Sequence, residues 1–357
     1  MKIKLTSGAS EKIKFLRSLT LKPSLPILHN ILIFSDNGTL KVAATDLETT
    51  IIFTLKETRW EGEDRFLLPA REISEILNQA TEAKICKEDA NLAKVLLNGV
   101  KFEIALTSVD DFPDLPSLGK EHKCFSVPGD VFKKAIQKVV FATAKDTDFS
   151  PLRGVNLRSK SLIASDGHIL AIATIYNQEQ DTNCIISPKA LSLLSKFLSN
   201  QNIDVYVGET TICFKTDDLF ISTQLIAQKF PDISSILREK MEISCLVEKN
   251  ALKDMVQKAS ILAKDAANRV VLDFDKEKLL VSSTSSIGNA LGEVSVKVKW
   301  GSEKLPVKLG FNYAYLLSIL ERLEEEIIEI GLIDPESQTI WKGDKMAKYV
   351  LMPMKLT

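Results

Sequence analysis

The chain has 357 residues, of which 45% are hydrophobic, and its formal net charge is −1. This length accommodates two or three domains, and the balanced charge excludes the overall basic excess that marks many nucleic-acid-binding proteins. No run approaches 18 consecutive apolar residues and no apolar segment follows Met1, so we predict neither a membrane span nor a secretory leader. We therefore expect a cytoplasmic protein.

The N-terminal third contains two similar halves, each with a strand, a turn and a helix. The first opens with "IKLTSGASEKIKFLRSLT" at Ile3 and the second with "FLLPAREISEIL" at Phe66. Alternating runs such as "KFEI" at residues 101–104 follow the helices and predict strand hairpins, because alternate side chains of a strand face the same side. Each half is therefore predicted to be β-α-β-β-β.

The same plan recurs twice further along the chain. Its halves open with "FSVPGDVFKKAIQKVV" at Phe125, "CIISPKALSLLSKFL" at Cys184, "CLVEKNALKDMVQKAS" at Cys245 and "VKLGFNYAYLLSILERL" at Val307. Recurrence of one pattern at regular intervals along the chain indicates internal repeats. We predict an α+β protein of three tandem repeats of a twofold β-α-β-β-β domain, at residues 1–120, 121–240 and 241–357.

Two other landmarks follow the same period. The motif Phe-Pro-Asp occurs twice, with Pro113 and Pro231 lying 118 residues apart. Asp46 in "ATDLE" and Asp166 in "ASDGH" lie 120 residues apart. Asp166 and His168 could suggest acid–base catalysis, but an Asp that bonds its own turn backbone explains both copies better.

The sequence lacks the motifs of common enzyme classes. It contains no phosphate-binding G-x-x-x-x-G-K-[ST], no G-x-G-x-x-G, no H-E-x-x-H and no G-x-S-x-G. Its five cysteines include no C-x-x-C pair, so we expect free thiols instead of disulfides or a zinc site. We predict no catalytic residue, no metal and no cofactor.

Basic residues recur on the exposed face of the first helix in each repeat. Their buried stripes, such as Phe132, Ala135, Ile136 and Val139, leave the opposite faces open. These faces carry Lys12, Lys14, Arg17, Lys133, Lys134, Lys138, Lys253 and Lys258. They fit a phosphate-facing surface that reads no base sequence, although exposed helix faces are also commonly rich in lysine.

Several motifs together resemble the bacterial DNA polymerase III beta subunit family, the sliding clamps. They are "LPILHNILI", "ATDLE", "LRGV" with "ASDGH", "FPD" and the terminal "YVLMPMKL", and they span the whole chain in order. The resemblance implies the DNA clamp fold, with helices inside a ring and sheets outside. It also implies a head-to-tail homodimer that encircles double-stranded DNA and serves as a processivity factor in DNA replication, opened by a clamp loader.

The resemblance implies a partner-peptide pocket for the replicative DNA polymerase and other proteins with clamp-binding motifs. Its residues would be Leu152, Ser165, Gly167, His168, Leu170, Pro231, Ile236, Val350, Met352, Pro353, Met354 and Leu356. Methionines adapt to different ligands, although core packing also accounts for Val350. The family often has Arg where Ile169 and Ser235 stand, so peptide preference can differ here.

The resemblance also implies a dimer interface and one more DNA contact. Phe102 and Ile104 of one subunit would meet Ile261 and Leu262 of the other. Lys22 matches a DNA-contacting loop position. Two rival hypotheses remain, namely a peptide-binding adaptor without topological DNA binding and an acid–base enzyme that uses Asp166 and His168.

Overall fold

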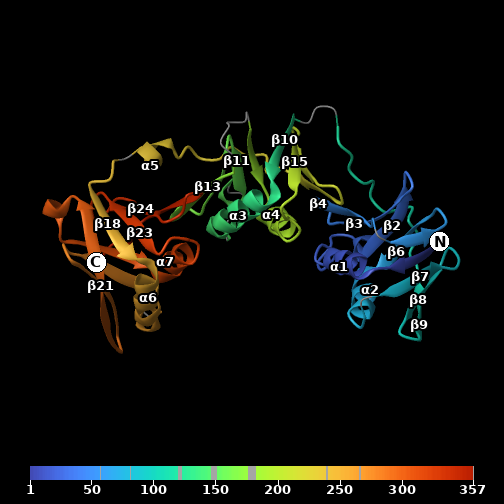
Figure 1. The fold of residues 1–357 in the computed structure, drawn as a ribbon, viewed down its shortest axis with the longest axis horizontal. Coiled ribbons are helices and arrows are strands. Elements are labelled where there is room, and N and C mark those ends of the chain that lie inside the picture. The colour runs from blue at the N-terminus through green and yellow to red at the C-terminus, as the bar shows by residue number, and fades with distance from the viewer. Residues whose placement is uncertain are drawn as a thin grey trace. The chain divides into compact units, whose positions relative to one another are not determined.

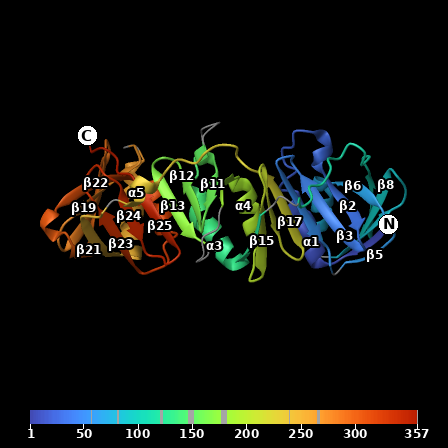
Figure 2. The same ribbon diagram turned by 90° about the horizontal axis from the view of Figure 1, so that it is seen from above.

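The computed structural model describes residues 1–56, 58–80, 82–119, 123–145, 151–175, 182–238, 240–264 and 267–356, without the side chains of residues 123, 124, 235 and 238. The chain divides into two compact units (Figure 1, Figure 2). Unit 1 joins Met1–Gly129 to Leu198–Leu225, and unit 2 joins Asp130–Phe197 to Ile226–Thr357.

Unit 1 contains one sheet of five strands and one of eight strands. Their orders are β5-β1-β7-β8-β9 and β10-β15-β16-β17-β4-β3-β2-β6. In chain order the elements of unit 1 are β1 (Lys2–Leu5), α1 (Ser7–Leu16), η1 (Pro26–His29), β2 (Asn30–Asp36), β3 (Thr39–Thr45), β4 (Thr49–Thr54), β5 (Arg59–Glu61), β6 (Arg65–Pro69), α2 (Ala70–Leu77), β7 (Ala83–Lys87), β8 (Leu92–Leu97), β9 (Val100–Ala105), β10 (Lys123–Pro128), β15 (Asn202–Val207), β16 (Thr211–Lys215) and β17 (Leu219–Gln224).

Unit 2 contains a twelve-stranded sheet, in the order β14-β11-β12-β13-β25-β24-β23-β18-β21-β20-β19-β22. Its elements are α3 (Gly129–Val139), η2 (Val140–Ala142), η3 (Pro151–Arg153), β11 (Val155–Arg158), β12 (Ser161–Ser165), β13 (Ile169–Thr174), β14 (Asn183–Ile186), α4 (Pro188–Ser195), α5 (Ser234–Arg238), β18 (Ile243–Glu248), α6 (Lys249–Ala263), β19 (Arg269–Phe274), β20 (Lys278–Ser285), β21 (Gly288–Trp300), η4 (Ser302–Lys304), β22 (Val307–Asn312), α7 (Tyr313–Leu320), β23 (Ile327–Leu332), β24 (Thr339–Lys342) and β25 (Ala347–Leu351).

The predicted β-α-β-β-β plan is confirmed in all six halves. The elements run β1-α1-β2-β3-β4, β6-α2-β7-β8-β9, β10-α3-β11-β12-β13, β14-α4-β15-β16-β17, β18-α6-β19-β20-β21 and β22-α7-β23-β24-β25. Paired halves exchange first strands, since β1 pairs with β7 and β6 pairs with β2. The strand β5 and the short helix α5 are additions that the repeat did not predict.

Apolar stripes bury the longer helices, and a polar side chain caps the first turn of α1, α6 and α7. In α3, Phe132, Ala135, Ile136 and Val139 are buried, as the helical period predicts. The Glu248 side chain begins α6 by accepting hydrogen bonds from the backbone N–H groups of Asn250 and Ala251. The core lies between the helices and the sheets, since α1 packs beside α2, and α6 packs on β20 and β21.

Two strand pairings join consecutive repeats, and we call each a joint. In the first joint the third strand of repeat one, β4, pairs with the last strand of repeat two, β17. In the second joint β13 of repeat two pairs with β25 of repeat three. Both pairings are antiparallel and lie within one unit each. Among the described residues no helix is long and apolar enough to cross a membrane.

Candidate functional site

An apolar cluster in unit 2 gathers four of the residues predicted for the partner pocket. Leu170 and Val350 are buried in it, at 4% and 3% exposed, and Leu152 and Ile236 pack against it. The other members are Ile163, Ile172, Ile185, Phe230, Ile233, Ile340, Ile226, Leu237 and Met241. The side chains come from β12, β13, β24, β25 and the segment around α5, so distant parts of the sequence share one apolar floor.

The turn between β12 and β13 carries Ser165, Gly167 and His168 at the edge of this floor. Asp166 Oδ1 accepts hydrogen bonds from the backbone N–H groups of His168 at 2.9 Å and Ile169 at 3.0 Å. Asp46 Oδ1 does the same for the Thr49 N–H at 2.7 Å. The prediction that both aspartates form turns is therefore confirmed. Gly167 has φ of 94°, a left-handed conformation that favours glycine.

The C-terminal segment attaches to this turn through its backbone. The Met352 N–H donates to the His168 carbonyl at 2.9 Å, and the Met354 N–H donates to the Gly310 carbonyl at 2.7 Å. These bonds leave the Met352 and Leu356 side chains 39% and 43% exposed. Pro353 and Met354 are half-buried. The segment therefore presents apolar side chains above a buried apolar floor, which suits binding of another apolar chain.

Ile169 is buried, whereas Pro231 is exposed. Ile169 is 1% exposed and pairs with Leu351, so the side chain at this position belongs to the interior in this chain. Pro231 is exposed at the start of the segment that leads to α5. The side chain of Ser235, the other departure from the family pattern, lies outside the described part of the structure.

Tyr315 on α7 belongs to the same site, and the sequence reasoning missed it. Its hydroxyl donates to Asp166 Oδ2 at 2.5 Å, and its ring lies 6.2 Å from the His168 ring between centroids. Burial, with the Asp166 carboxylate in addition, raises the pKa of Tyr315 to about 12. Asp166 therefore accepts hydrogen bonds from Tyr315 and from its own turn. Its role is to hold these groups in position. No sequence pattern linked residues 149 positions apart.

The basic residues of the three first helices differ in exposure. Lys134 and Lys258 are exposed, whereas Lys14, Lys133 and Lys253 are half-buried. Arg17 lies 3.5 Å from Glu75, Lys253 lies 3.6 Å from Glu321 and Lys258 lies 2.5 Å from Asp254. Lys12 Nζ lies 2.5 Å from Asp218 Oδ2. Many of these charges are therefore partly neutralised within the chain.

Lys138 corrects one prediction, because it is buried instead of lying on an exposed face. The residue is 6% exposed, and its ammonium donates to Asp344 and to the Arg322 carbonyl. Glu324 lies 2.9 Å away. The last turn of α3 faces the hairpin between β24 and β25, where a buried carboxylate requires a cation. Helical periodicity alone could not reveal Asp344, because Asp344 is a neighbour of Lys138 only in the folded chain.

The predicted dimer residues lie on or beside two strand edges that have no partner within the part of the chain that the structure describes. Phe102 is half-buried and Ile104 is 8% exposed on β9, at the end of the five-stranded sheet. Ile261 is 71% exposed on α6, and Leu262 beside it is half-buried. Ile287, in the turn of the β20–β21 hairpin, and Leu291, on β21, are each 74% exposed and were not predicted. Lys22 is exposed in a loop of unit 1.

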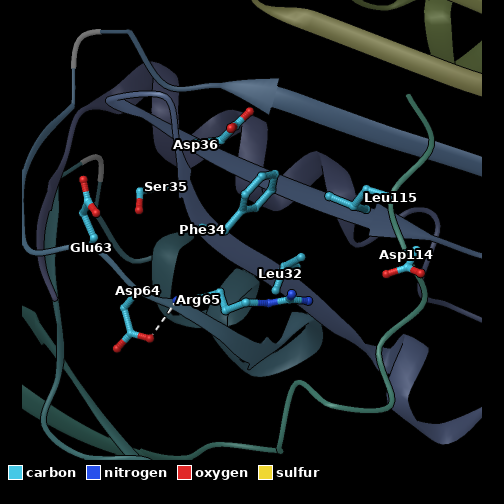
Figure 3. A pocket seen from close by; sticks show the side chains of 9 residues that line it. All are labelled: Leu32, Phe34, Ser35, Asp36, Glu63, Asp64, Arg65, Asp114 and Leu115. Atoms are coloured by element: carbon cyan, nitrogen blue, oxygen red, sulfur yellow. Dashed lines mark hydrogen bonds between the residues drawn. The ribbon is translucent and has the colours of Figure 1, made fainter. Parts of the chain in front are cut away.

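A separate hollow of about 540 Å³ in unit 1 contains none of the predicted site residues (Figure 3). Phe34, Leu32 and Leu115 form its apolar wall, and the side chains of Asp36, Glu63, Asp64, Asp114 and Arg65 surround it. Lys87 and Lys41 pair with Asp64 at 2.6 Å and Asp36 at 2.5 Å. Asp36 and Asp64 therefore serve as ion-pair partners at this hollow.

The cysteines whose side chains the structure describes carry free thiols. Cys86, Cys184, Cys213 and Cys245 are free, and burial raises the pKa of the Cys184 thiol to about 12. Such thiols are poor nucleophiles at neutral pH. Within the described ranges no group of three or more His, Cys, Asp or Glu side chains is placed to hold a metal ion.

Comparison with known proteins gives a single family along the chain. Models of the DNA polymerase III beta subunit match its N-terminal domain at residues 10–116, its central domain at 126–232 and its C-terminal domain at 234–355. The Haemophilus influenzae beta sliding clamp is 26% identical over 353 residues, covering 95% of this chain and 94% of that protein. The Staphylococcus aureus beta sliding clamp is 24% identical over 363 residues, with 95% of both chains covered.

Solved structures share the whole fold. The DNA polymerase III beta subunit of Thermotoga maritima superimposes with a TM-score of 0.90 at 23% identity, and the sliding clamp of Bartonella birtlesii bound to griselimycin with 0.91 at 21%. Both comparisons cover 100% of each chain. The fold and the joined repeats define a three-domain clamp. The chain belongs to the DNA polymerase III beta subunit family, the beta sliding clamps of DNA replication.

Proposed function

We propose that this sliding clamp acts as a head-to-tail homodimer, a ring that encircles duplex DNA and tethers the replicative polymerase. Its three domains would be residues 1–120, 121–240 and 241–357. The proposal rests on the joints between repeats, because one chain forms two of them and leaves the strands of a third without partners in the described part of the chain. The last strand of repeat two pairs with the third strand of repeat one, and the last strand of repeat three pairs with the third strand of repeat two.

Two strands lack such partners among the described residues. They are the last strand of repeat one and the third strand of repeat three. β9, the last strand of repeat one, pairs only with β8, and residues 288–295 of β21, the third strand of repeat three, pair only with β20 among the described residues. Unpaired edges of this kind readily pair with another chain. A third joint, formed by β9 of one copy and β21 of another, completes the series and closes a ring of two chains.

The first two joints also supply a register for the third. Ile51 pairs with Ile221 in the first joint, and Ala171 pairs with Tyr349 in the second. The β20–β21 hairpin, which ends at the Ser285–Gly288 pair, corresponds to the β3–β4 and β12–β13 hairpins. The β8–β9 hairpin, which ends at the Leu97–Val100 pair, corresponds to the β16–β17 and β24–β25 hairpins. By this correspondence, Phe102 faces Ala290, Ile104 faces Gly288 and Val100 faces Gly292 across the third joint.

This register brings large side chains opposite small ones. Gly288, Ala290 and Gly292 share the half-buried face of β21, and Leu262 of α6 lies beneath Gly288. Phe102 and Ile104 would fill the space over these small residues and meet Leu262. Burial of apolar area from both copies supplies the favourable free energy of closure.

The DNA-facing role falls to the basic residues of the first helices. Lys14, Lys22, Lys133, Lys134, Lys253 and Lys258 are exposed or half-buried, so their ammonium groups can approach phosphates. Contacts to phosphate are independent of base sequence and weaken with salt. A ring that is held topologically needs few such contacts, and partial pairing of its lysines with acids favours sliding.

The apolar cluster of unit 2 and the C-terminal segment would hold peptides of the polymerase and of other partners. The floor of Leu170 and Val350 is fixed by strand pairing, whereas Met352 and Leu356 are exposed and adaptable. Asp166 is engaged with Tyr315 and its turn, which supports a binding protein without catalytic activity. No nucleotide-binding motif occurs, so opening falls to a separate ATP-using loader.

One observation favours the adaptor as the second candidate. Lys12, Arg17, Lys253 and Lys258 have acidic partners within the chain, and Lys138 is buried. This reduces the basic surface on which DNA binding depends. Such an adaptor would bind partner peptides without retention on circular DNA.

A cross-linking experiment tests the ring. The double variant Phe102→Cys, Ala290→Cys should form disulfides between copies on mild oxidation, giving a covalent dimer on a non-reducing gel. The matched control Phe102→Cys, Leu291→Cys places the second thiol on the opposite face of β21 and should cross-link much less. Monomers from both variants, with no dimer by sedimentation, would contradict the ring.

A further inference from the structure

Each joint inside the chain carries a lysine–aspartate tie. At the first joint, Lys12 of α1 lies 2.5 Å from Asp218 and donates to the Thr54 carbonyl at 3.3 Å. At the second joint, Lys138 of α3 pairs with Asp344. The side chains of the second pair are 7% and 2% exposed. Both ties therefore lie in surroundings where charges interact more strongly than on an open surface.

The two ties join the same kinds of element, although Lys12 lies earlier in its helix than Lys138 does. The lysine comes from the first helix of one repeat, and the aspartate comes from the hairpin turn before the last strand of the next repeat. Asp218 directly precedes β17, and Asp344 lies three residues before β25. Each tie thus connects the helix layer of one repeat to the strand that the neighbouring repeat adds to its sheet.

The corresponding residues of the third joint differ in charge. The turn before β9 is Asn98-Gly99, with φ of 48° and 81°, and it contains no acid. In α6, Lys258 occupies the position of Lys138, 120 residues further along the same helix pattern. Its ammonium lies 2.5 Å from Asp254 on its own helix, and both side chains are at least half exposed. Asn98 lies in the turn before the last strand of repeat one, as Asp218 and Asp344 lie in the turns before the last strands of repeats two and three.

We propose that the joint between two copies is formed without the lysine–aspartate tie of the two internal joints, and that Asn98 opposite Lys258 is the residue that keeps it weak. This inference rests on the proposed ring. Asn98 is neutral, so closure forms no ion pair at this position, and opening separates none there. The joint between copies is thereby the one that opens while the two joints inside the chain stay closed.

The variant Asn98→Asp tests this inference with little change to the backbone. Asp-Gly suits the same tight turn as Asn-Gly, so the β8–β9 hairpin should keep its shape. The new carboxylate should pair with Lys258 of the other copy and slow dissociation of the dimer. We expect a decrease in the dissociation rate of about three- to tenfold at low salt, of which most should disappear at high salt.

Subunit exchange measures this rate directly. Copies labelled at the N-terminus with a donor or an acceptor fluorophore are mixed, and loss of energy transfer is followed after adding excess unlabelled protein. The matched controls are Lys258→Met and the double variant Asn98→Asp, Lys258→Met. Both should exchange at about the wild-type rate, because neither contains both members of the new pair.

The outcomes separate this inference from the proposed function. A wild-type protein that sediments as a monomer throughout would overturn the ring and this inference with it. A dimer whose exchange rate is the same with Asn98→Asp, or is slowed equally with and without Lys258, would overturn only the tie. Slower exchange that depends on Lys258 and on salt supports it.

Discussion

Leu170 in β13 and Val350 in β25 lie opposite each other in one antiparallel ladder, although 180 residues separate them in the sequence. Both are buried in the cluster that Leu152 and Ile236 also contact. The pairing fixes a shared apolar floor between the second and third repeats. In the proposed binding site, the side chains above that floor, and not the floor itself, would adapt to a partner.

Met352 should contribute strongly to partner binding. Its side chain is 39% exposed, while its backbone is held by the His168 carbonyl, so Met352→Ala removes apolar contact without disturbing the fold. We expect the affinity for the replicative polymerase to fall about tenfold, or about 1.4 kcal/mol, by surface plasmon resonance. Ile327→Ala, at a site 49% exposed elsewhere in unit 2, is the control. Equal affinities for both variants would move the binding site elsewhere.

Gly154→Ala should damage the same site from below. A Cβ atom at position 154 would lie 2.1 Å from Ile185 Cγ2 and 2.8 Å from Ile226 Cδ1, far inside contact distance. Because Ile185 belongs to the buried cluster, we expect both weaker partner binding and a loss of about 1–3 kcal/mol in unfolding free energy. Gly8→Ala, at a glycine of α1 with nothing within 4 Å and no left-handed φ, is the control and should lose no stability. Wild-type binding and stability in Gly154→Ala would contradict the close packing.

Lys138→Met should destabilise unit 2. It leaves the Asp344 side chain, 2% exposed, without its cation, and such a loss costs about 3 kcal/mol. Chemical denaturation followed by the fluorescence of buried Trp341 should report a lower midpoint. Lys134→Met, at an exposed position of the same helix, should leave the midpoint nearly unchanged. An unaltered midpoint for both would mean that the pair adds no stability.

Asp218→Asn should reduce stability in a pH-dependent way. Burial acts to raise the pKa of Asp218, but the hydrogen bond and charge of Lys12 outweigh it and lower the pKa below 3.8. The contribution is therefore complete above about pH 4 and is lost as pH falls through the folded-state pKa. The variant should be less stable than wild type at pH 7, and the difference should shrink near pH 3. Asp217→Asn, whose side chain is 83% exposed, should show little difference at either pH.

Ile261→Glu should weaken the dimer without affecting the fold. The side chain is 71% exposed, so the monomer tolerates a charge there, whereas burial between copies would penalise it. We expect sedimentation equilibrium to give a dimer dissociation constant at least about tenfold higher. Ile327→Glu provides the matched control. A wild-type dissociation constant for Ile261→Glu would place the interface away from α6.

Repetition made most of the fold predictable. Six copies of one pattern specified six helices and their following strands, because each half must bury the same helical stripe against its sheet. The exchange of first strands between halves, and the pairing of β4 with β17, depend on contacts that no local pattern encodes. The short helix α5 and strand β5 follow no repeat and were missed.

The candidate site likewise contains residues that sequence motifs reveal and residues that only the tertiary contacts reveal. Residues in recognisable motifs, such as Leu170 and Val350, could be named from the sequence and lie in one cluster. Tyr315 could not, because its link to Asp166 exists only in three dimensions. Lys138 was misassigned for the same reason, since helical periodicity places it outward and a buried carboxylate from residue 344 reverses that.

The central claim, a ring closed around DNA, is tested most directly by retention on DNA of two shapes. The protein is loaded onto nicked circular plasmid by a clamp loader and ATP, freed of unbound protein by gel filtration in moderate salt, and half the sample is then linearised. We predict that it stays on circles and leaves linear DNA, most clearly when the Phe102→Cys, Ala290→Cys variant is cross-linked after loading and before linearisation. Equal retention on both shapes would mean binding by contact and would contradict the ring.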